Sequence, residues 1–116
     1  MPTGREHILY AAGAAGVVLH AVDHLVTGHE WDFWYTAAVL LSALTAALAF
    51  VYRWVPARVR AAVVIPLGAM WAVVAFVNHV LGLFIGGPSP SDYTGVFSSV
   101  GGVLMVGAGL QARSTI

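Results

Sequence analysis

The sequence predicts an all-α integral membrane protein, built as a bundle of four transmembrane helices that run up, down, up and down. Of its 116 residues, 59% are hydrophobic and only 9% are charged, whereas soluble domains average about 45–50% and about 25%. Four apolar segments have the length of a membrane span. The polar connections between them are short, so consecutive helices must be antiparallel neighbours. We expect residues 1–116 to form this one domain.

The first span is expected at about residues 8–27 and ends at a polar and aromatic stretch, 28–32. Arg5 ahead of an apolar run is also a feature of signal peptides. Histidines and an aspartate interrupt this run before any small-residue cleavage site, so we expect a span that is retained. The second span is expected at about 34–52, where nearly every position is apolar, and it ends at a proline and three arginines in the stretch 53–60.

The third span is expected at about 61–85. The glycines, prolines and serines of the stretch 86–92 end it, because such a stretch cannot continue as a helix or a strand. The fourth span is expected at about 95–112, with glycines recurring along one face. Gly102 and Gly109 on that face are expected at close helix contacts, which would lie either inside the bundle or between the copies of a homo-oligomer.

The charges at the two ends of the predicted helices have opposite signs. Five arginines and one glutamate fall at the end that holds both termini and the second connection, a net charge of +4. Three acidic residues at the other end give −3. Since arginine is enriched in cytoplasmic loops, we expect both termini in the cytoplasm of a multi-pass protein of the cell membrane. Its partners would be the lipid bilayer and either a larger membrane complex or a second copy of the chain.

The composition also excludes several functions. The chain has no cysteine, which rules out disulfides, thiolate metal sites and cysteine nucleophiles. The formal net charge is zero and there is no basic run, so we expect no nucleic-acid partner.

Three histidines and one aspartate fall inside the predicted spans. His20 and His24 are four residues apart, so they lie on one face of the first helix, and Asp23 borders that face. At 1.5 Å per residue, His24 lies roughly 24 Å from the inner end of its span, and His79 of the third span lies roughly 27 Å from its own. All four are therefore expected in the outer leaflet, with His24 and His79 at nearly one level. Ionisable residues inside a membrane are costly and are usually functional.

Neutral imidazole is the commonest protein ligand of transition metals. The first helix would supply two histidine ligands and a facing helix would supply His79, with Asp23 as a fourth ligand or as a partner that orients an imidazole. His29 and Glu30, in the loop just above, are further candidates. Nitrogen and carboxylate ligands suit copper(II), zinc or iron. We expect a small membrane protein that binds such a metal and supports electron transfer or a larger membrane redox complex.

Three other functions remain open from the sequence. One histidine of the first helix and His79 could ligate a b-type haem. Asp23 and the histidines could instead titrate in turn in a small transporter or proton relay. In a structural accessory subunit, the histidines would only form hydrogen bonds between helices.

Overall fold

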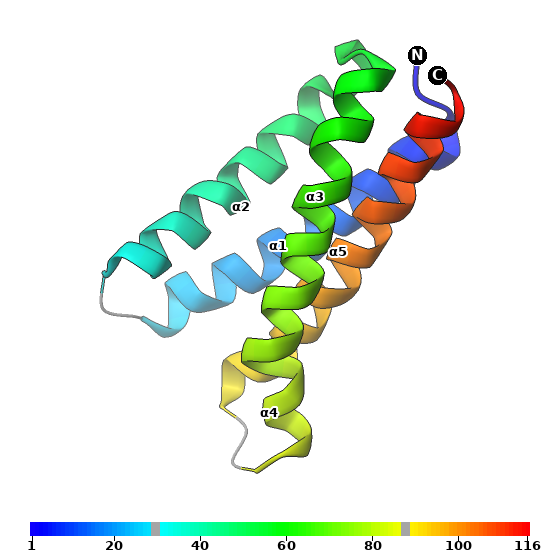
Figure 1. Ribbon diagram of the computed structural model, residues 1–116. Coiled ribbons are helices and arrows are strands. Elements are labelled where there is room, and N and C mark those ends of the chain that lie inside the picture. The colour runs from blue at the N-terminus through cyan, green and yellow to red at the C-terminus, as the bar shows by residue number, and fades with distance from the viewer. Residues whose placement is uncertain (29–30, 87–88) are drawn as a thin grey trace.

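The computed structural model of the chain describes residues 1–28, 31–86 and 89–116, and its elements are all helical (Figure 1). In chain order they are α1 (Gly4–Thr27), α2 (Phe33–Val51), the 3-10 turn η1 (Tyr52–Trp54), α3 (Ala57–Ala75), the π-helical turn η2 (Phe76–Val80), α4 (Leu81–Phe84) and α5 (Pro90–Ser114). Since η1 continues α2, and η2 and α4 continue α3, the described residues form four helices that are long and apolar enough to cross a membrane. The prediction of an all-α chain with four such helices is confirmed.

The last long helix begins earlier than the sequence predicted. α5 begins at Pro90 rather than near residue 95, with a proline in its first turn, where proline is favoured. The amide of Ser89 donates a hydrogen bond to Oδ2 of Asp92 at 2.9 Å, which caps the helix in the manner of a capping box. The stretch 86–92 was expected not to continue as a helix or strand for long, and its last three residues form the start of α5.

The first and third long helices also begin ahead of their predicted spans. At the start of α1, Oγ1 of Thr3 accepts a hydrogen bond from the amide of Glu6 at 3.1 Å, which satisfies one of the unpaired amides of the first turn. α3 begins at Ala57, directly after Pro56. The second connection is consequently shorter than the sequence suggested.

α5 is the central helix of the bundle. It packs along both α1 and α3, whereas α2 packs mainly against α1. Of the apolar stretch of α5, 44% is buried inside the molecule, against 11% for α2. Large side chains of α2, including Leu40, Leu44 and Phe50, are exposed, which is consistent with contact with a lipid bilayer. The buried core between the helices comprises Tyr10, Ala14, Val17, Tyr52, Val64, Trp71, Met105 and Ala108.

Glycine allows α5 to approach α3 closely. A Cβ atom at Gly102 would collide with the backbone nitrogen of Ala72 and the carbonyl oxygen of Gly68. Gly109 lies against Ile65 in a similarly tight contact. Both glycines singled out in the sequence therefore lie at contacts inside the bundle.

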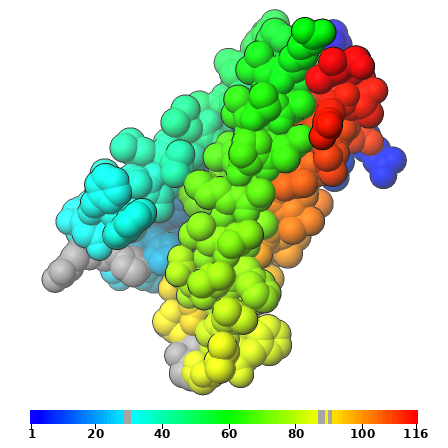
Figure 2. All heavy atoms as spheres, viewed as in Figure 1, coloured from blue at the N-terminus to red at the C-terminus, as the bar shows by residue number. Residues whose placement is uncertain are grey.

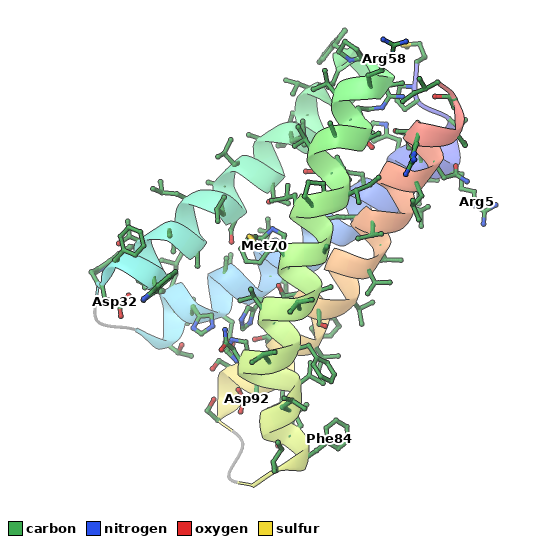
Figure 3. All side chains as sticks on the ribbon, viewed as in Figure 1. Arg5, Asp32, Arg58, Met70, Phe84 and Asp92 are labelled. Atoms are coloured by element: carbon green, nitrogen blue, oxygen red, sulfur yellow. The ribbon has the colours of Figure 1, made fainter. Side chains whose placement is uncertain are left out.

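The two ends of the bundle differ in charge and in shape. Consecutive long helices run in opposite directions, and both termini lie at one end, which we call the terminal end (Figure 1). Arg5 and Arg58 lie there, whereas Asp32 and Asp92 lie at the opposite end, which we call the histidine end (Figure 3). At the histidine end the start of α2 and the α4 segment lie apart (Figure 2).

A buried ion pair joins three elements at the terminal end. Glu6 of α1 is fully buried and Arg60 of α3 is 3% exposed. Nε of Arg60 donates to Oε1 of Glu6 at 2.7 Å, and the hydroxyl of Tyr52 donates to the same oxygen at 2.9 Å. The guanidinium also donates to the carbonyl of Val55 and to the second carboxylate oxygen. Both charges are thus satisfied within the bundle.

Candidate metal centre

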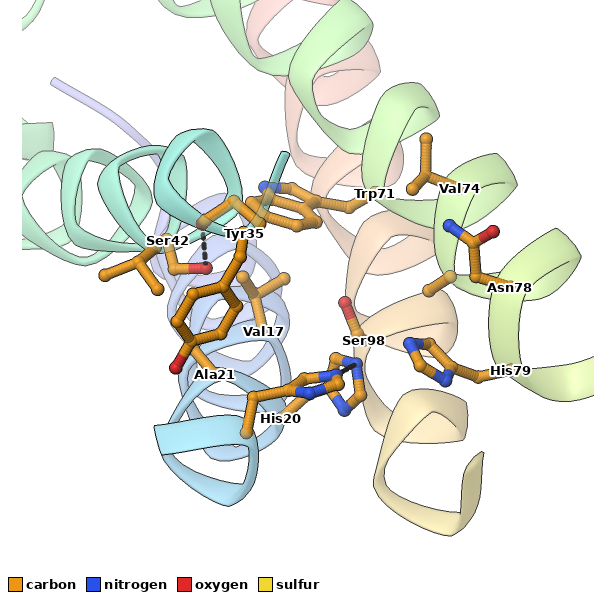
Figure 4. A pocket seen from close by; sticks show the side chains of 14 residues that line it. Val17, His20, Ala21, Tyr35, Ser42, Trp71, Val74, Asn78, His79 and Ser98 are labelled. Carbon is orange, nitrogen blue, oxygen red and sulfur yellow. Dashed lines mark hydrogen bonds between the residues drawn. The ribbon is translucent and has the colours of Figure 1, made fainter. Parts of the chain in front are cut away.

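Three histidines meet at the histidine end. His20 and His24 lie on α1 and His79 lies on η2, and one ring nitrogen of each is within 4.8 Å of those of the other two. The ring centroids of His20 and His79 are 4.4 Å apart, and those of His24 and His79 are 5.3 Å apart. Figure 4 shows the rings of His20 and His79 turned toward each other from facing helices. The structure therefore brings together three of the predicted ligands.

Local backbone features set the positions of these rings. His20 and His24 are one helical turn apart on α1. His79 belongs to the π-helical turn η2, a widened turn of a kind that is frequent at functional sites. A Cβ atom at Gly95 of α5 would overlap the Cβ and Cγ atoms of His79. Only glycine at this position lets α5 pack so closely against that histidine.

The hydrogen bonds of His20 determine which of its ring nitrogens carries the proton. Oγ1 of Thr94 donates to Oδ2 of Asp23 at 2.6 Å, because an ionised carboxylate can only accept. The same Oγ1 lies 3.0 Å from Nδ1 of His20, and it accepts there because its single proton is already engaged. Nδ1 is therefore the protonated nitrogen, and Nε2 of His20 carries a lone pair.

The same logic applies to His79, through a direct contact. Nδ1 of His79 lies 2.9 Å from Oδ1 of Asp92, so the nitrogen donates and the carboxylate accepts. Nε2 of His79 is left with a lone pair. A carboxylate that holds the far nitrogen of a histidine in this way is typical of metal-binding histidines, because it fixes the tautomer and makes the imidazole a better ligand.

His24 completes the triad. Its Nε2 lies 3.0 Å from Nε2 of His20, and without a metal ion it donates to the lone pair there. Two nitrogens bound at 2.0–2.1 Å to one tetrahedral ion are about 3.3 Å apart, so the observed separation is close to what a shared ion requires. A bound ion would replace this hydrogen bond, with the proton of His24 released or held on its other ring nitrogen.

A cavity of about 190 Å³ adjoins the triad and is lined by all three histidines. Its walls come from α1, α2, α3 with η2, and α5. The inner wall is formed by buried side chains, among them Val17, Trp71 and Ala75. Figure 4 shows the side chains that line the cavity, with Val17 and Trp71 labelled. The candidate metal centre therefore borders a small, mostly apolar space.

The other predicted site residues lie around the triad or outside the described residues. Asp23 does not belong to the group of converging nitrogens, but it contacts His20 through Thr94. His29 and Glu30 lie outside the described residues.

Two residues at the site were not singled out from the sequence. Asp92 was assigned only to the outer charge count, and Thr94 was not considered. Their signal in the sequence was the short connection between the third and fourth spans, which brings Asp92 back to the level of His79 only 13 positions later. A polar residue early in the fourth helix was therefore a candidate partner for that histidine.

Comparisons with protein-family models, with curated proteins and with solved structures give no match. The fold and the site alone define the class: an all-helical chain with four helices able to cross a membrane and a cluster of three histidines that could hold a metal ion.

Proposed function

We propose that this chain is a small multi-pass membrane protein that binds one transition-metal ion, copper, zinc or iron, through His20, His24 and His79. The observation that carries the proposal is the convergence of three imidazoles from two helices, with one nitrogen of each within 4.8 Å of the others. The orientation of two of these rings by carboxylates, directly by Asp92 and through Thr94 by Asp23, supports it further.

The ligand set bears on the chemistry of the bound ion. Three imidazoles leave one position of a four-coordinate ion for another ligand, as in catalytic zinc sites. Zinc has no redox chemistry. Electron transfer within a larger membrane redox complex therefore belongs to this proposal only for the copper or iron form.

We further propose that both termini face the cytoplasm of the cell membrane. Arg5, Arg53, Arg58 and Arg113 are exposed at the terminal end, and exposed arginine is enriched in cytoplasmic loops. A topology reporter fused after Ile116 should then read cytoplasmic, and one inserted at Ser89 should read external. The same result from both fusions would contradict four membrane crossings.

A b-type haem has less support than an ion. A haem with two axial histidines lies between their rings, whereas the rings of His20 and His79 touch edge to face with centroids 4.4 Å apart. The adjoining cavity of about 190 Å³ is also smaller than the usual ligand pocket of about 300–1,000 Å³. Both observations favour a compact ligand.

A proton relay is a second candidate, favoured by a specific observation. Asp23, Thr94, His20 and His24 form an unbroken chain of hydrogen bonds. Such a chain would carry protons without any metal ion, because each group can both bind and release one. A purely structural role would show neither metal binding nor proton movement.

The metal proposal is tested with chelator-treated protein in detergent, titrated with Zn²⁺ or Co²⁺ and analysed for metal content. We expect one ion per chain. His79→Ala and His24→Ala should each abolish stoichiometric binding. The double variant should lose nothing more, because the effects of mutations at residues that bind the same metal ion are not additive. Binding should weaken as the solution becomes more acidic, because protons compete with the metal ion for the same lone pairs.

His7→Ala is the matched control, because this histidine stacks on Tyr52 far from the triad and its loss should leave the metal content unchanged. Full retention of metal in His79→Ala would overturn the proposal. Proton flux into liposomes that persists with a chelator present and stops in Asp23→Asn would instead support the relay.

A further inference from the structure

The cavity beside the triad contains a polar atom that the described protein does not satisfy. Ser98 of α5 is 1% exposed and lines the cavity, and its Oγ has no hydrogen-bond partner among the described residues. Figure 4 shows this hydroxyl turned toward the middle of the cavity, on the side of Trp71. A buried hydroxyl is costly to leave without a partner. Its position thus points to a ligand that can hydrogen-bond to it.

The rest of the cavity selects for an apolar molecule. Val17, Val74 and Ala75 contribute aliphatic surface, and Trp71 contributes an aromatic face. The ring nitrogen of Trp71 is already engaged, because it donates to Oγ1 of Thr45 at 3.1 Å. A ligand that fits these walls is largely apolar and carries few polar atoms.

The mouth of the cavity lies between α2 and the third long helix. Ala38 of α2, and Val74 and Asn78 of the opposite wall, are exposed, while Val17 and Ser98 on the far side are buried. Because α2 packs mainly against α1, this side of the bundle is open between the two helices. In a four-span protein such an opening faces the hydrocarbon of the bilayer, where small neutral molecules dissolve and ions do not.

We propose that this cavity binds a small neutral molecule, apolar except for one oxygen or nitrogen, that arrives from the bilayer and hydrogen-bonds to Ser98. An apolar cavity of about 150 Å³ admits benzene, so a volume of about 190 Å³ suits a ligand of that size with one polar substituent. The cavity and Ser98 need no metal. Only the further step, in which the bound molecule lies against the ion held by the three histidines, rests on the proposed function.

The test uses the full chain in nanodiscs after chelator treatment, with 4-fluorophenol as the probe and fluorobenzene as the matched probe without a hydroxyl group. Saturable binding is followed by fluorine NMR. Ala38→Phe should abolish it by filling the mouth, whereas Ala43→Phe, the same change at an exposed position of α2 outside the cavity, should not. Val74→Phe closes the mouth from the opposite wall and repeats the test if Ala38→Phe does not fold.

Ser98→Ala separates the hydrogen bond from the shape of the cavity. We expect about 2- to 10-fold weaker binding of 4-fluorophenol, the value of one hydrogen bond, and unchanged binding of fluorobenzene. The variant should unfold at no lower temperature than the wild type, because this hydroxyl makes no bond within the described protein.

Equal binding of 4-fluorophenol to the Ala38→Phe and Ala43→Phe variants would overturn the proposal, and so would an equal loss of both probes in Ser98→Ala. The metal step is read separately from the visible spectrum of the Co²⁺-loaded protein, which should change when 4-fluorophenol is added. Failure to bind Co²⁺ together with intact binding of the probe would reject the proposed metal function and leave the cavity proposal supported.

Discussion

The two ends of the bundle both bury polar side chains, but they use them differently. At the terminal end, Glu6 and Arg60 bond to each other. Glu6 also accepts a hydrogen bond from Tyr52, and Arg60 donates one to the Val55 carbonyl. A buried network whose hydrogen bonds are all satisfied fixes how the helices pack, and it has no remaining hydrogen-bonding capacity for a ligand.

At the histidine end the hydrogen bonds leave ring nitrogens that a metal ion could use. Thr94 and Asp92 hold the protons of His20 and His79 on Nδ1, so both Nε2 atoms carry lone pairs, and the lone pair of His20 accepts only from the exchangeable proton of His24. Ser98 has no partner among the described residues. Burial of polar groups alone therefore does not indicate function. What indicates it is a buried group whose remaining bonding capacity faces a shared space.

The largest expected effect lies at the terminal end. Arg60→Met removes one partner of a buried ion pair and leaves the charge of Glu6 uncompensated, which typically costs about 3–5 kcal/mol. Unfolding in mixed detergent should show this loss, while the folded fraction still binds one metal ion per chain. Arg58→Met, an exposed position on the same helix, is the control and should change stability by less than about 0.5 kcal/mol. If the two variants are equally stable, the buried pair does not hold this end together.

The next largest effect is expected at the histidine end, where a mutation should weaken metal binding and leave stability almost unchanged. Asp92→Asn removes the charge that orients His79, and we expect about 10- to 100-fold weaker metal binding with little change in unfolding. Asparagine can keep the cap of α5, because its side-chain oxygen still accepts from the Ser89 amide. Asp32→Asn removes an exposed acidic charge at the same end, where it caps α2, and should leave metal affinity unchanged. Equal losses in both variants would mean that net charge, and not the contact with His79, matters.

The number of helices and the meeting of the histidines at one end could be predicted from the sequence, because both depend on helix geometry alone. A rise of 1.5 Å per residue predicts that His24 and His79 lie at one level, and a spacing of four predicts that His20 and His24 share a face. Helix number follows from apolar segment length. These predictions need no knowledge of how the helices are rotated against one another.

The remaining features depend on that rotation. Asp92 reaches His79 only because α5 begins at Pro90, which is a capping effect that hydropathy does not show. The hydropathy of the third span also gave no indication of the π-helical turn that contains His79. Glu6 and Arg60, 54 positions apart, were counted as terminal-end charges in the sequence, although they neutralise each other inside the bundle.

The smallest expected effect concerns Thr94, which transmits the influence of Asp23 to His20. Thr94→Val keeps the shape of the side chain but removes the hydroxyl, so Nδ1 of His20 loses its acceptor and its tautomer is no longer fixed. One neutral hydrogen bond is worth about 0.5–1.5 kcal/mol, so metal affinity should fall by about 2- to 10-fold, less than in Asp92→Asn. Thr94→Ser retains the hydroxyl and should restore most of the affinity. Metal titrations of the two variants side by side make the comparison, and equal affinities would show that the chain from Asp23 to His20 does not tune the site.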